Sequence, residues 1–424
     1  MTATETHQAI NAVWRIESAR IIAGVARIVG DVGQAEDLAQ DALVAALETW
    51  PRSGVPDNPG AWLMTAAKNR AIDLLRRDKR LELKHQQLGH ELEAQREMAV
   101  PDLDRGLDDE VGDDLLRLVF TACHPVLSTE ARVALTLRLL GGLTTDEIAR
   151  AFLIPLPAMA QRIVRAKKTL AEARVPFEVP RGAELAARLA SVLEVVYLIF
   201  NEGYSATAGD EWLRPALCED ALRLGRILAE LAPGEAEVHG LVALMEIQAS
   251  RSRARVGPSG EPILLLDQNR GRWDQLLIRR GLAALQRAER LGGAAGPYAL
   301  QAAIVACHAR ARSPEETDWA RIVEIYGALA RIAPSPVIEL NRAVAVGMAS
   351  GPAAALELVD PLTALPALKA YHLLPSVRGD LLFKLGRFPE AKAEFERAAA
   401  LTRNGRERDL LLKRAAACVE SSTH

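Results

Sequence analysis

Two clusters of basic side chains have residue types and spacing that suit contact with nucleic acid. The first cluster, on a segment expected to be helical, consists of Trp62, Lys68, Asn69, Arg70, Asp73, Arg76 and Arg77. Lysine and arginine pair with phosphates and release counterions. The amide of Asn69 can bond base edges, and the ring of Trp62 can stack on an unpaired base. The cluster therefore predicts a nucleic-acid-binding helix, and the plainer alternative is a solvated, charged helix surface.

The second basic cluster lies on the second helix of a predicted helix-turn-helix and consists of Gln161, Arg162, Arg165, Lys167 and Lys168. Thr144 followed by Glu147 predicts a capping box that begins a first helix over 146–152. A turn through Pro155 then leads to a second helix that starts near Pro157. We expect the apolar side chains of this unit to pack it together, namely Ile148, Ala149, Ile163, Val164 and Leu170. Capping, turn and charge together favour DNA binding over a basic hairpin without DNA.

A third group of polar residues is acidic rather than basic. Asp37, Gln40 and Asp41 stand at i, i+3 and i+4 and so share one side of a predicted helix, while Leu38 and Leu43 supply an apolar side. An acidic helix face that precedes a basic one indicates two partners, a protein and a nucleic acid. Ordinary amphipathic decoration is the alternative explanation of this face.

The elements that position these residues are expected to be helices throughout. The 424-residue chain is 49% apolar and 25% charged, as in ordinary soluble globular proteins, and has only 4% aromatic residues. Apolar residues recur at i, i+3 and i+4, without sustained period-2 alternation. Pro59 suits a first helical position, with Asp57 or Asn58 as the preceding cap. The predicted fold class is all-α.

The chain divides by composition into four segments. Residues 8–85 are amphipathic helices, 86–114 an acidic linker, 115–178 the helix-turn-helix unit, and 180–424 a long Ala/Leu-rich helical region. In the last segment, small and large residues recur with the offsets of a tetratricopeptide (TPR) repeat. These are Gly379, Leu382, Ala391, Phe395 and Ala398, with an earlier copy at Ala343, Val346, Ala355 and Val359 and a looser one at Ala320. We therefore expect a TPR-like solenoid over about 300–405.

Several classes of protein are disfavoured by what the sequence lacks. Its four cysteines form no CxxC pair, so neither a metal site nor a redox dithiol is expected. It contains no Gly-rich phosphate loop, no HExxH and no GxSxG, so we expect no cofactor and no enzyme activity. The longest apolar run, 195–200, is far too short to span a bilayer, and the N-terminus does not resemble a signal peptide. The expected protein is soluble and cytoplasmic, without a membrane partner.

Taken together, the motifs resemble those of an alternative sigma factor of the extracytoplasmic-function (ECF) class. Residues 8–85 resemble sigma region 2 through AEDLAQD at 35–41 and WLMTAAKNRAID at 62–73. Residues 115–178 resemble region 4 through LTTDEIA at 143–149 and RAKKTL at 165–170. The remainder is similar to the C-terminal extension of the subgroup that carries a TPR-like domain, through FNEGY at 200–204, DQNRGRWD at 267–274 and GPYALQAAI at 296–304.

The resemblance implies a role for each cluster. Asp37, Gln40 and Asp41 would contact the clamp helices of the β′ subunit of core RNA polymerase, and region 4 its β flap. The cluster from Trp62 to Arg77 would engage the promoter −10 region, and the cluster from Gln161 to Lys168 the −35 element. The acidic linker would run through the RNA path of the polymerase or serve as a plain tether. The C-terminal domain would regulate the sigma core through an intramolecular contact or a protein partner.

Some features leave alternatives open. The recognition helix begins PAMAQ at 157–161, where many relatives carry Thr, Lys and Ser, so no promoter preference can be carried over. Arg270, Arg272, Trp273 and Asp274 form a polar and aromatic cluster that is either an intramolecular contact or helix packing. The competing class is a TPR-linked helix-turn-helix regulator that does not join polymerase. Such a regulator would leave the acidic face at Asp37 without a role.

Overall fold

The computed structural model describes residues 3–87 and 107–421. These residues form eighteen α-helices, short 3-10 turns and two strands of two residues each, which confirms the predicted all-α class. The chain divides into two compact units, residues 1–196 and 197–424, which we call unit 1 and unit 2. The predicted linker falls largely on 88–106, outside the described residues. Among the described residues, no helix is long and apolar enough to cross a bilayer.

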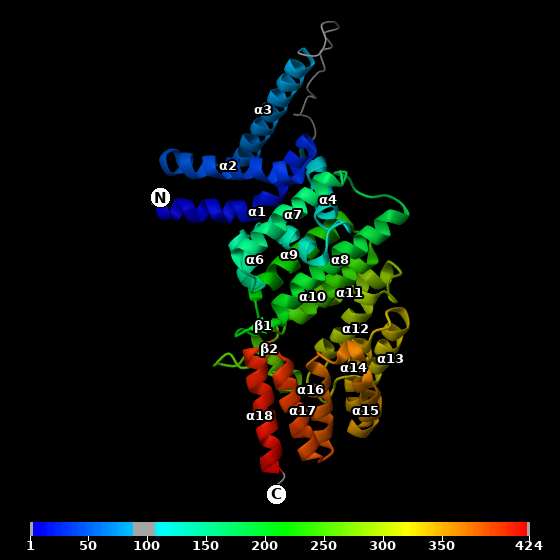
Figure 1. The fold of residues 1–424 in the computed structure, drawn as a ribbon. Coiled ribbons are helices and arrows are strands. Elements are labelled where there is room, and N and C mark those ends of the chain that lie inside the picture. The colour runs from blue at the N-terminus through cyan, green and yellow to red at the C-terminus, as the bar shows by residue number, and fades with distance from the viewer. Residues whose placement is uncertain (1–2, 88–106, 422–424) are drawn as a thin grey trace. The chain divides into compact units, whose positions relative to one another are not determined.

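Unit 1 contains seven complete helices and the first part of an eighth (Figure 1). Their bounds are α1 Ala3–Val29, α2 Val32–Ser53, α3 Pro59–Gln87, α4 Leu107–Ala122, α5 Thr129–Leu139, α6 Thr145–Ala151, α7 Leu156–Glu172 and α8 Ala183–Tyr204.

Helices α1, α2 and α3 pack on one another around a core that contains both large and small side chains. Ile21 and Ile22 of α1, Trp50 of α2 and Leu63 of α3 are almost completely buried. The starts of the later two helices are set locally. The carboxylate of Asp31 accepts from the Gln34 amide at 2.8 Å, and the side chain of Asn58 accepts from the Ala61 amide at 3.0 Å. Asn58 therefore caps α3, with Pro59 at its first position as the sequence predicts.

Helix α4 begins at Leu107, inside the segment that the sequence presents as linker. Asp114, the last residue expected in that linker, is buried and pairs with Arg27 of α1 at 3.2 Å and Arg117 at 2.7 Å. The ion pair with Arg27 explains why the sequence places Asp114 in the linker. A run of acidic residues indicates a solvated segment unless a cationic partner far away in the chain is known. The first part of α8 also belongs to unit 1. Its Arg188 donates to the carbonyl of Phe120 at 2.9 Å, and its Ser191 to that of Cys123 at 2.7 Å.

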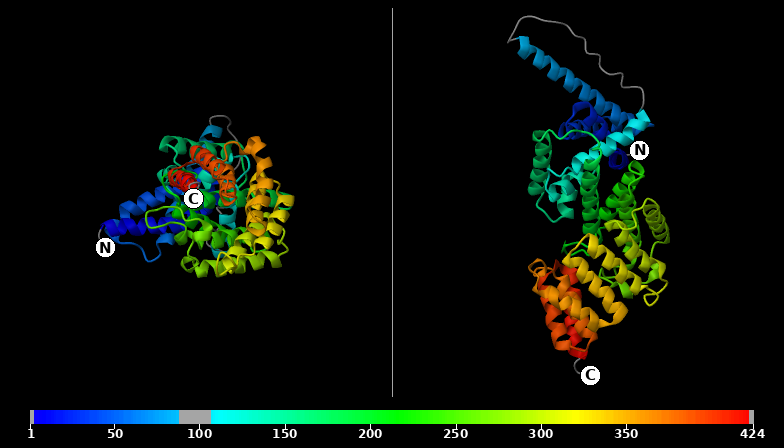
Figure 2. Two further views of the ribbon diagram at one scale, coloured as in Figure 1. Left: turned by 90° about the horizontal axis from the view of Figure 1, so that it is seen from below. Right: turned by 90° about the vertical axis from the view of Figure 1, so that its right-hand side faces the viewer.

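Unit 2 consists of the end of α8 and ten further helices, whose neighbours along the chain lie side by side (Figures 1 and 2). Their bounds are α9 Pro215–Leu231, α10 Ala236–Ala249, α11 Gln275–Arg290, α12 Pro297–Arg310, α13 Trp319–Ile332, α14 Pro336–Ser350, α15 Pro352–Val359, α16 Leu373–Lys384, α17 Phe388–Leu401 and α18 Gly405–Ser421. The strands β1 Ala208–Gly209 and β2 Arg403–Asn404 pair in parallel.

The repeat positions near the C-terminus form the core of α14 to α18. Leu382, Ala391, Phe395 and Ala398 are buried, and a Cβ at Gly379 would meet the ring of Phe395 at 2.9 Å. A small residue at 379 is therefore what lets α16 and α17 approach closely. The third, looser repeat copy fits less well, because Ala320 lies exposed at the start of α13.

Candidate functional site

One face of α3 carries the exposed members of the first basic cluster. Asn69, Asp73, Arg76 and Arg77 are all exposed and follow the spacing of about four residues that keeps side chains on one side of a helix. Asp73 lies within 3.7 Å of Arg76, as an exposed pair one turn apart. The amide of Asn69 and the two guanidinium groups are thus exposed on the same side of α3.

The other members of this cluster point elsewhere. Trp62 is half-buried, with its ring edge-on to that of Trp50 at 5.4 Å between centroids, so its ring is not an open platform for a base. Arg70 bends back to the carbonyl of Ala66 at 3.0 Å. The half-buried Lys68 lies on the α1 side of α3, within about 4 Å of where a Cβ on Gly24 would lie. The structure therefore does not bring the seven predicted residues onto one surface.

The acidic face of α2 is accessible and longer than predicted. Asp37 and Asp41 are exposed, whereas Gln40 is half-buried and donates to Glu36 at 2.5 Å. Val44 and Glu48 continue the exposed stripe by one and two further turns. Sequence reasoning missed these two residues, although the i+7 and i+11 spacing from Asp37 would have indicated them.

Glu36 of unit 1 makes contacts that the sequence does not predict. Its carboxylate is only 2% exposed and joins segments that lie far apart in the sequence. It accepts from Arg138 of α5 at 2.5 Å and lies 2.6 Å from the Lys167 ammonium of α7. Lys167 also lies 3.4 Å from Asp37. We call Glu36, Asp37, Arg138 and Lys167 the α2–α7 tie.

The tie places two predicted binding residues against each other. Asp37 belongs to the predicted protein-binding face and Lys167 to the predicted DNA-binding face, and each is a partner of the other. Arg15 of α1 and Glu147 of α6 form a second ion pair, at 2.9 Å. This pair also links the first three helices to the helix-turn-helix. Because Lys167 is turned toward α2, it does not lie with the exposed cations of α7. Glu36 lies in the motif at 35–41, but no sequence signal indicates its partners, since they lie 102 and 131 positions away.

The helix-turn-helix forms as its capping residues predict. Thr144 accepts from the Glu147 amide at 3.2 Å, and the carboxylate of Glu147 accepts from the Thr144 amide at 2.8 Å. Burial opposes ionisation of Glu147, but its carboxylate accepts hydrogen bonds from the amide and the hydroxyl of Thr144, and these bonds and the nearby Arg15 hold the pKa of the carboxyl below its usual value. The turn before α7 includes Leu153, whose φ of 52° lies in the left-handed region.

The outer side of α7 presents a mixed polar and apolar surface. Gln161, Arg165 and Lys168 are exposed and Arg162 is half-buried. The prediction that Val164 packs the unit is wrong, because its side chain is 62% exposed between the exposed residues. Buried positions of α7 recur at Met159, Ile163, Ala166 and Leu170. Val164 follows Ile163 directly and so lies about 100° around the helix, away from the core.

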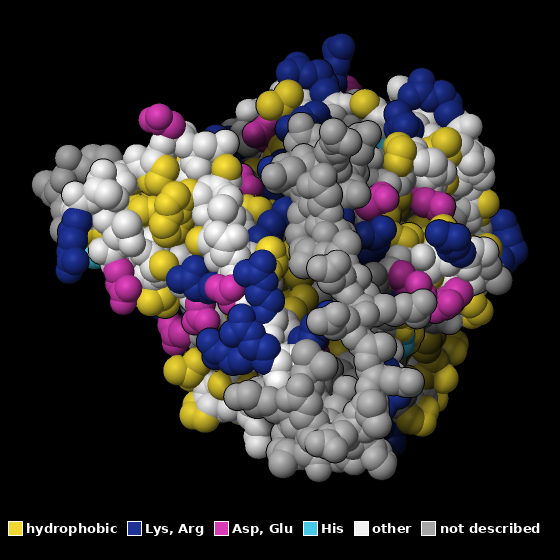
Figure 3. Space-filling view, turned by 90° about the horizontal axis from the view of Figure 1, so that it is seen from above, with side chains coloured by type: hydrophobic (Ala, Val, Ile, Leu, Met, Phe, Trp, Pro, Cys, Tyr) yellow, Lys and Arg dark blue, Asp and Glu magenta, His cyan; other side chains and the backbone are white. Residues whose placement is uncertain are grey.

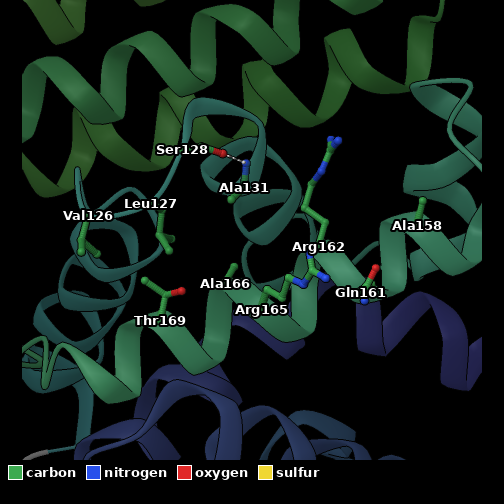
Figure 4. A pocket seen from close by; sticks show the side chains of 10 residues that line it. All are labelled: Val126, Leu127, Ser128, Ala131, Ala158, Gln161, Arg162, Arg165, Ala166 and Thr169. Carbon is green, nitrogen blue, oxygen red and sulfur yellow. Dashed lines mark hydrogen bonds between the residues drawn. The ribbon is translucent and has the colours of Figure 1, made fainter.

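A hollow of about 350 Å³ lies between α7 and the loop that leads into α5 (Figure 4). The loop side is lined by Val126 to Ser128, whose hydroxyl caps α5 by accepting from the Ala131 amide. The α7 side is lined by Gln161, Arg162 and Arg165, among others. Two guanidinium groups beside the positive end of a helix suit a phosphate group. The hollow therefore extends the basic surface of α7 in a form that fits a nucleic-acid backbone.

The face seen from above in Figure 3 bears its charges in separate groups. Lys and Arg side chains gather in several patches, with Asp and Glu side chains and apolar patches between them. This pattern fits contact through particular helix faces better than attraction through one uniform basic surface.

The geometry and two family models agree on the class of unit 1. Residues 16–81 match sigma-70 region 2, and residues 117–170 match sigma-70 region 4. The exposed acidic and basic faces of α2 and α3 lie in the first match, and the capped helix-turn-helix in the second. The two matches support a sigma-factor role in promoter-specific transcription. Residues 188–289 match a family of unknown function, DUF6596.

The chain belongs to the same family as an uncharacterized protein of Rhizobium meliloti (strain 1021). The two are 45% identical over 374 residues, which is 88% of this chain and 87% of that protein. The match therefore extends well beyond the two sigma regions. No solved structure matches the chain.

Proposed function

We propose that the protein is an ECF-type sigma factor that joins core RNA polymerase and directs initiation at its own promoters. The observation that carries this proposal is the exposed acidic stripe of α2, which starts at Asp37 and Asp41 within a sigma-70 region 2. A DNA-binding protein that worked alone would have no use for an acidic stripe beside its basic helix. In this proposal the stripe contacts the β′ clamp helices, and region 4 contacts the β flap.

The DNA contacts are divided between α3 and α7. In our proposal, Asn69, Arg76 and Arg77 meet the −10 region through the exposed face of α3. Gln161, Arg162, Arg165 and Lys168 meet the −35 element through α7 and its hollow. Trp62, Lys68 and Arg70 support α3 from its less exposed sides, and Lys167 becomes available only when the α2–α7 tie opens.

Binding to core RNA polymerase tests the proposal without knowledge of the promoter. We expect the purified chain to bind core polymerase, and the triple variant Asp37→Ala, Gln40→Ala, Asp41→Ala to bind at least tenfold more weakly. A matched control replaces three exposed residues of unit 2 with the same chemistry, Glu230, Gln286 and Glu289, by alanine. The variant also removes the ion pair between Asp37 and Lys167 and so weakens the α2–α7 tie. If the only effect of Asp37 were to hold α7 over α2, the variant would bind core polymerase more tightly than the wild-type protein.

The C-terminal region, which we propose is TPR-like over its last helices, modulates this activity in place of a separate regulator. The test compares promoter output of the full chain with that of residues 1–196, in inducing and non-inducing conditions. Truncation at residue 180 is less suitable, because Arg188 and Ser191 bond to α4 and to the residue that follows it. Equal output from both chains in both conditions would contradict the modulation.

The competing proposal, a helix-turn-helix regulator that does not join polymerase, makes the opposite prediction. Such a protein would bind specific duplex DNA tightly by itself and would not bind core polymerase. The match of residues 16–81 to region 2 favours the sigma role over this class.

A further inference from the structure

Unit 2 contains a row of alternating rings and guanidinium groups that neither sigma region uses. In order along the row, its members are Trp212, Arg255, Tyr204, Arg251, Trp273 and Arg270. The Cζ atom of Arg255 lies 3.6 Å from the ring centroid of Tyr204. That of Arg251 lies 5.8 Å from the centroids of Tyr204 and Trp273. Cation–π attraction therefore links these residues, and we call the row the arginine–aromatic ladder.

Three members of the ladder are buried. Arg251 and Arg255 are each 8% exposed, and Trp273 is 4% exposed within a small core that includes Ala254 and Ile278. Trp273 is thus both a packing residue and part of an intramolecular contact. A guanidinium removed from water to this extent is costly unless a negative group compensates it.

Two of the arginines receive part of that compensation from helix ends. Arg255 donates to the carbonyl of Tyr204 at the end of α8. Arg270 donates to the carbonyls of His308 and Ala311 at the end of α12, at 2.6 and 2.7 Å. The C-terminal end of a helix carries a partial negative charge that favours cations.

Arg251 lacks such compensation. The one side-chain hydrogen bond of Arg251 in the described part of the chain goes to the hydroxyl of Tyr204, at 2.7 Å, and its buried Nε has no acceptor there. None of the described carboxylates lies within 4.0 Å of Arg251, Arg255 or Arg270. The charges of Glu315 and Glu316 still act on Arg270, so Arg251 and Arg255 are the members of the ladder that have no carboxylate partner among the described residues.

The environment of His308 shows that this region is positively charged. Its imidazole packs edge-on against Trp319 of α13, with ring centroids 5.1 Å apart, and its buried Nδ1 lacks a partner. Burial, together with the charges of Arg251 and Arg270 acting in the same direction, lowers the pKa of His308 to about 4. No negative group offsets them at this histidine.

We propose that the arginine–aromatic ladder binds an oxyanion, a phosphate or carboxylate group of a small molecule, beside Arg251. Guanidinium forks pair with both groups through parallel hydrogen bonds. Tyr204, Trp212 and Arg270 are half-buried, so the ladder reaches solvent at these members. All six members lie within residues 188–289, which match the family of unknown function. The proposal therefore also suggests a class of ligand for that family. The binding does not depend on the proposed sigma function.

The ring of His308 gives a direct readout of the site in the full-length protein. The test titrates the histidine ring signals by NMR, with the His308 signal identified by its absence in His308→Gln. The titration is repeated in chloride, inorganic phosphate and acetate at one ionic strength. We expect the pKa of His308 to rise in a saturable way with phosphate or acetate, since a bound anion offsets Arg251. A response to one anion alone identifies the group. No rise with either anion, beyond that in chloride, would overturn the proposal.

Thermal unfolding with matched variants assigns the binding to the ladder. The bound anion should raise the midpoint of the wild-type protein in proportion to the logarithm of its concentration above the Kd. Arg251→Gln should lose this rise. Arg226→Gln, which removes an arginine of the same unit that already pairs with Glu246 at 2.8 Å, should keep it. An equal rise in all three proteins would show that the anion binds elsewhere and would overturn the assignment.

Discussion

At the scale of single residues, Ile163 and Val164 are sequence neighbours with opposite environments. Ile163 is 5% exposed and Val164 is 62% exposed. We therefore expect Ile163→Ala to lower the free energy of unfolding by about 2–5 kcal/mol, and Val164→Ala to change it by less than about 0.5 kcal/mol. Urea unfolding followed by circular dichroism measures both. A cost for Val164→Ala as large as that for Ile163→Ala would mean that Val164 packs in a core after all.

His308 makes a second prediction at this scale, about pH. Its folded pKa of about 4 lies below the ordinary value of 6.5, so the unfolded chain takes up a proton first as the pH falls. Stability is therefore lost as the pH falls through 6.5 toward 4, by about 2 kcal/mol between about pH 7.5 and about pH 5. His308→Gln should remove this part of the pH dependence in unfolding measured across that range. An unchanged pH dependence in His308→Gln would show that His308 titrates normally.

Local chemistry is what the sequence predicts well at this scale. The reciprocal bonds of Thr144 and Glu147 and the cap at Asn58 follow from residue type and spacing alone. The partners of Glu36 and Asp114 do not, because an ion pair between distant segments leaves no periodic signal. The same limit applies to Trp62, since only the fold shows that Trp50 shields its ring.

At the scale of elements, the α2–α7 tie predicts unequal roles for two adjacent lysines. Lys167 bridges Glu36 and Asp37, whereas Lys168 is exposed and pairs only with Glu172, at 3.5 Å, among the ion pairs of the described residues. Lys167→Ala leaves a buried carboxylate with one cation fewer. We expect it to cost about 1–3 kcal/mol, against less than about 1 kcal/mol for Lys168→Ala.

Hydrogen exchange measures the effect on the elements themselves. The amides of α7, and of α6 packed against it, should exchange faster in Lys167→Ala, because the tie connects α7 to α2. Those of Lys168→Ala should exchange as in the wild-type protein. Equal protection in both variants would show that the ion pairs do not connect α7 to α2.

Element types follow from the sequence more readily than element limits or contacts. Apolar periodicity predicts helices throughout, and the structure has them. The early start of α4 and the pairing of β1 with β2 depend on partners far along the chain. Asn404 illustrates the point, because its side chain reaches the carbonyls of Ala206 at 3.0 Å and Glu211 at 2.8 Å.

At the scale of the whole molecule, the boundary at residue 196 predicts where the chain can be cut. A protein of residues 1–196 keeps the bonds that Arg188 and Ser191 make to Phe120 and Cys123. A protein of residues 1–179 loses both, which we expect to cost about 2–4 kcal/mol. Its unfolding midpoint should therefore lie roughly 5–10 °C below that of the longer protein in calorimetry. Equal midpoints would show that α8 does not stabilise unit 1.

The central claim, that the protein directs promoter-specific initiation, is tested most directly by transcription with purified components. Core RNA polymerase is supplied with fragmented genomic DNA, alone, with the full chain, or with residues 1–196, and the 5′ ends of the transcripts are mapped. Our account predicts a set of start sites that share upstream sequence and appear only when one of the two proteins is present. Start sites identical to those of core polymerase alone, with both proteins, would contradict it.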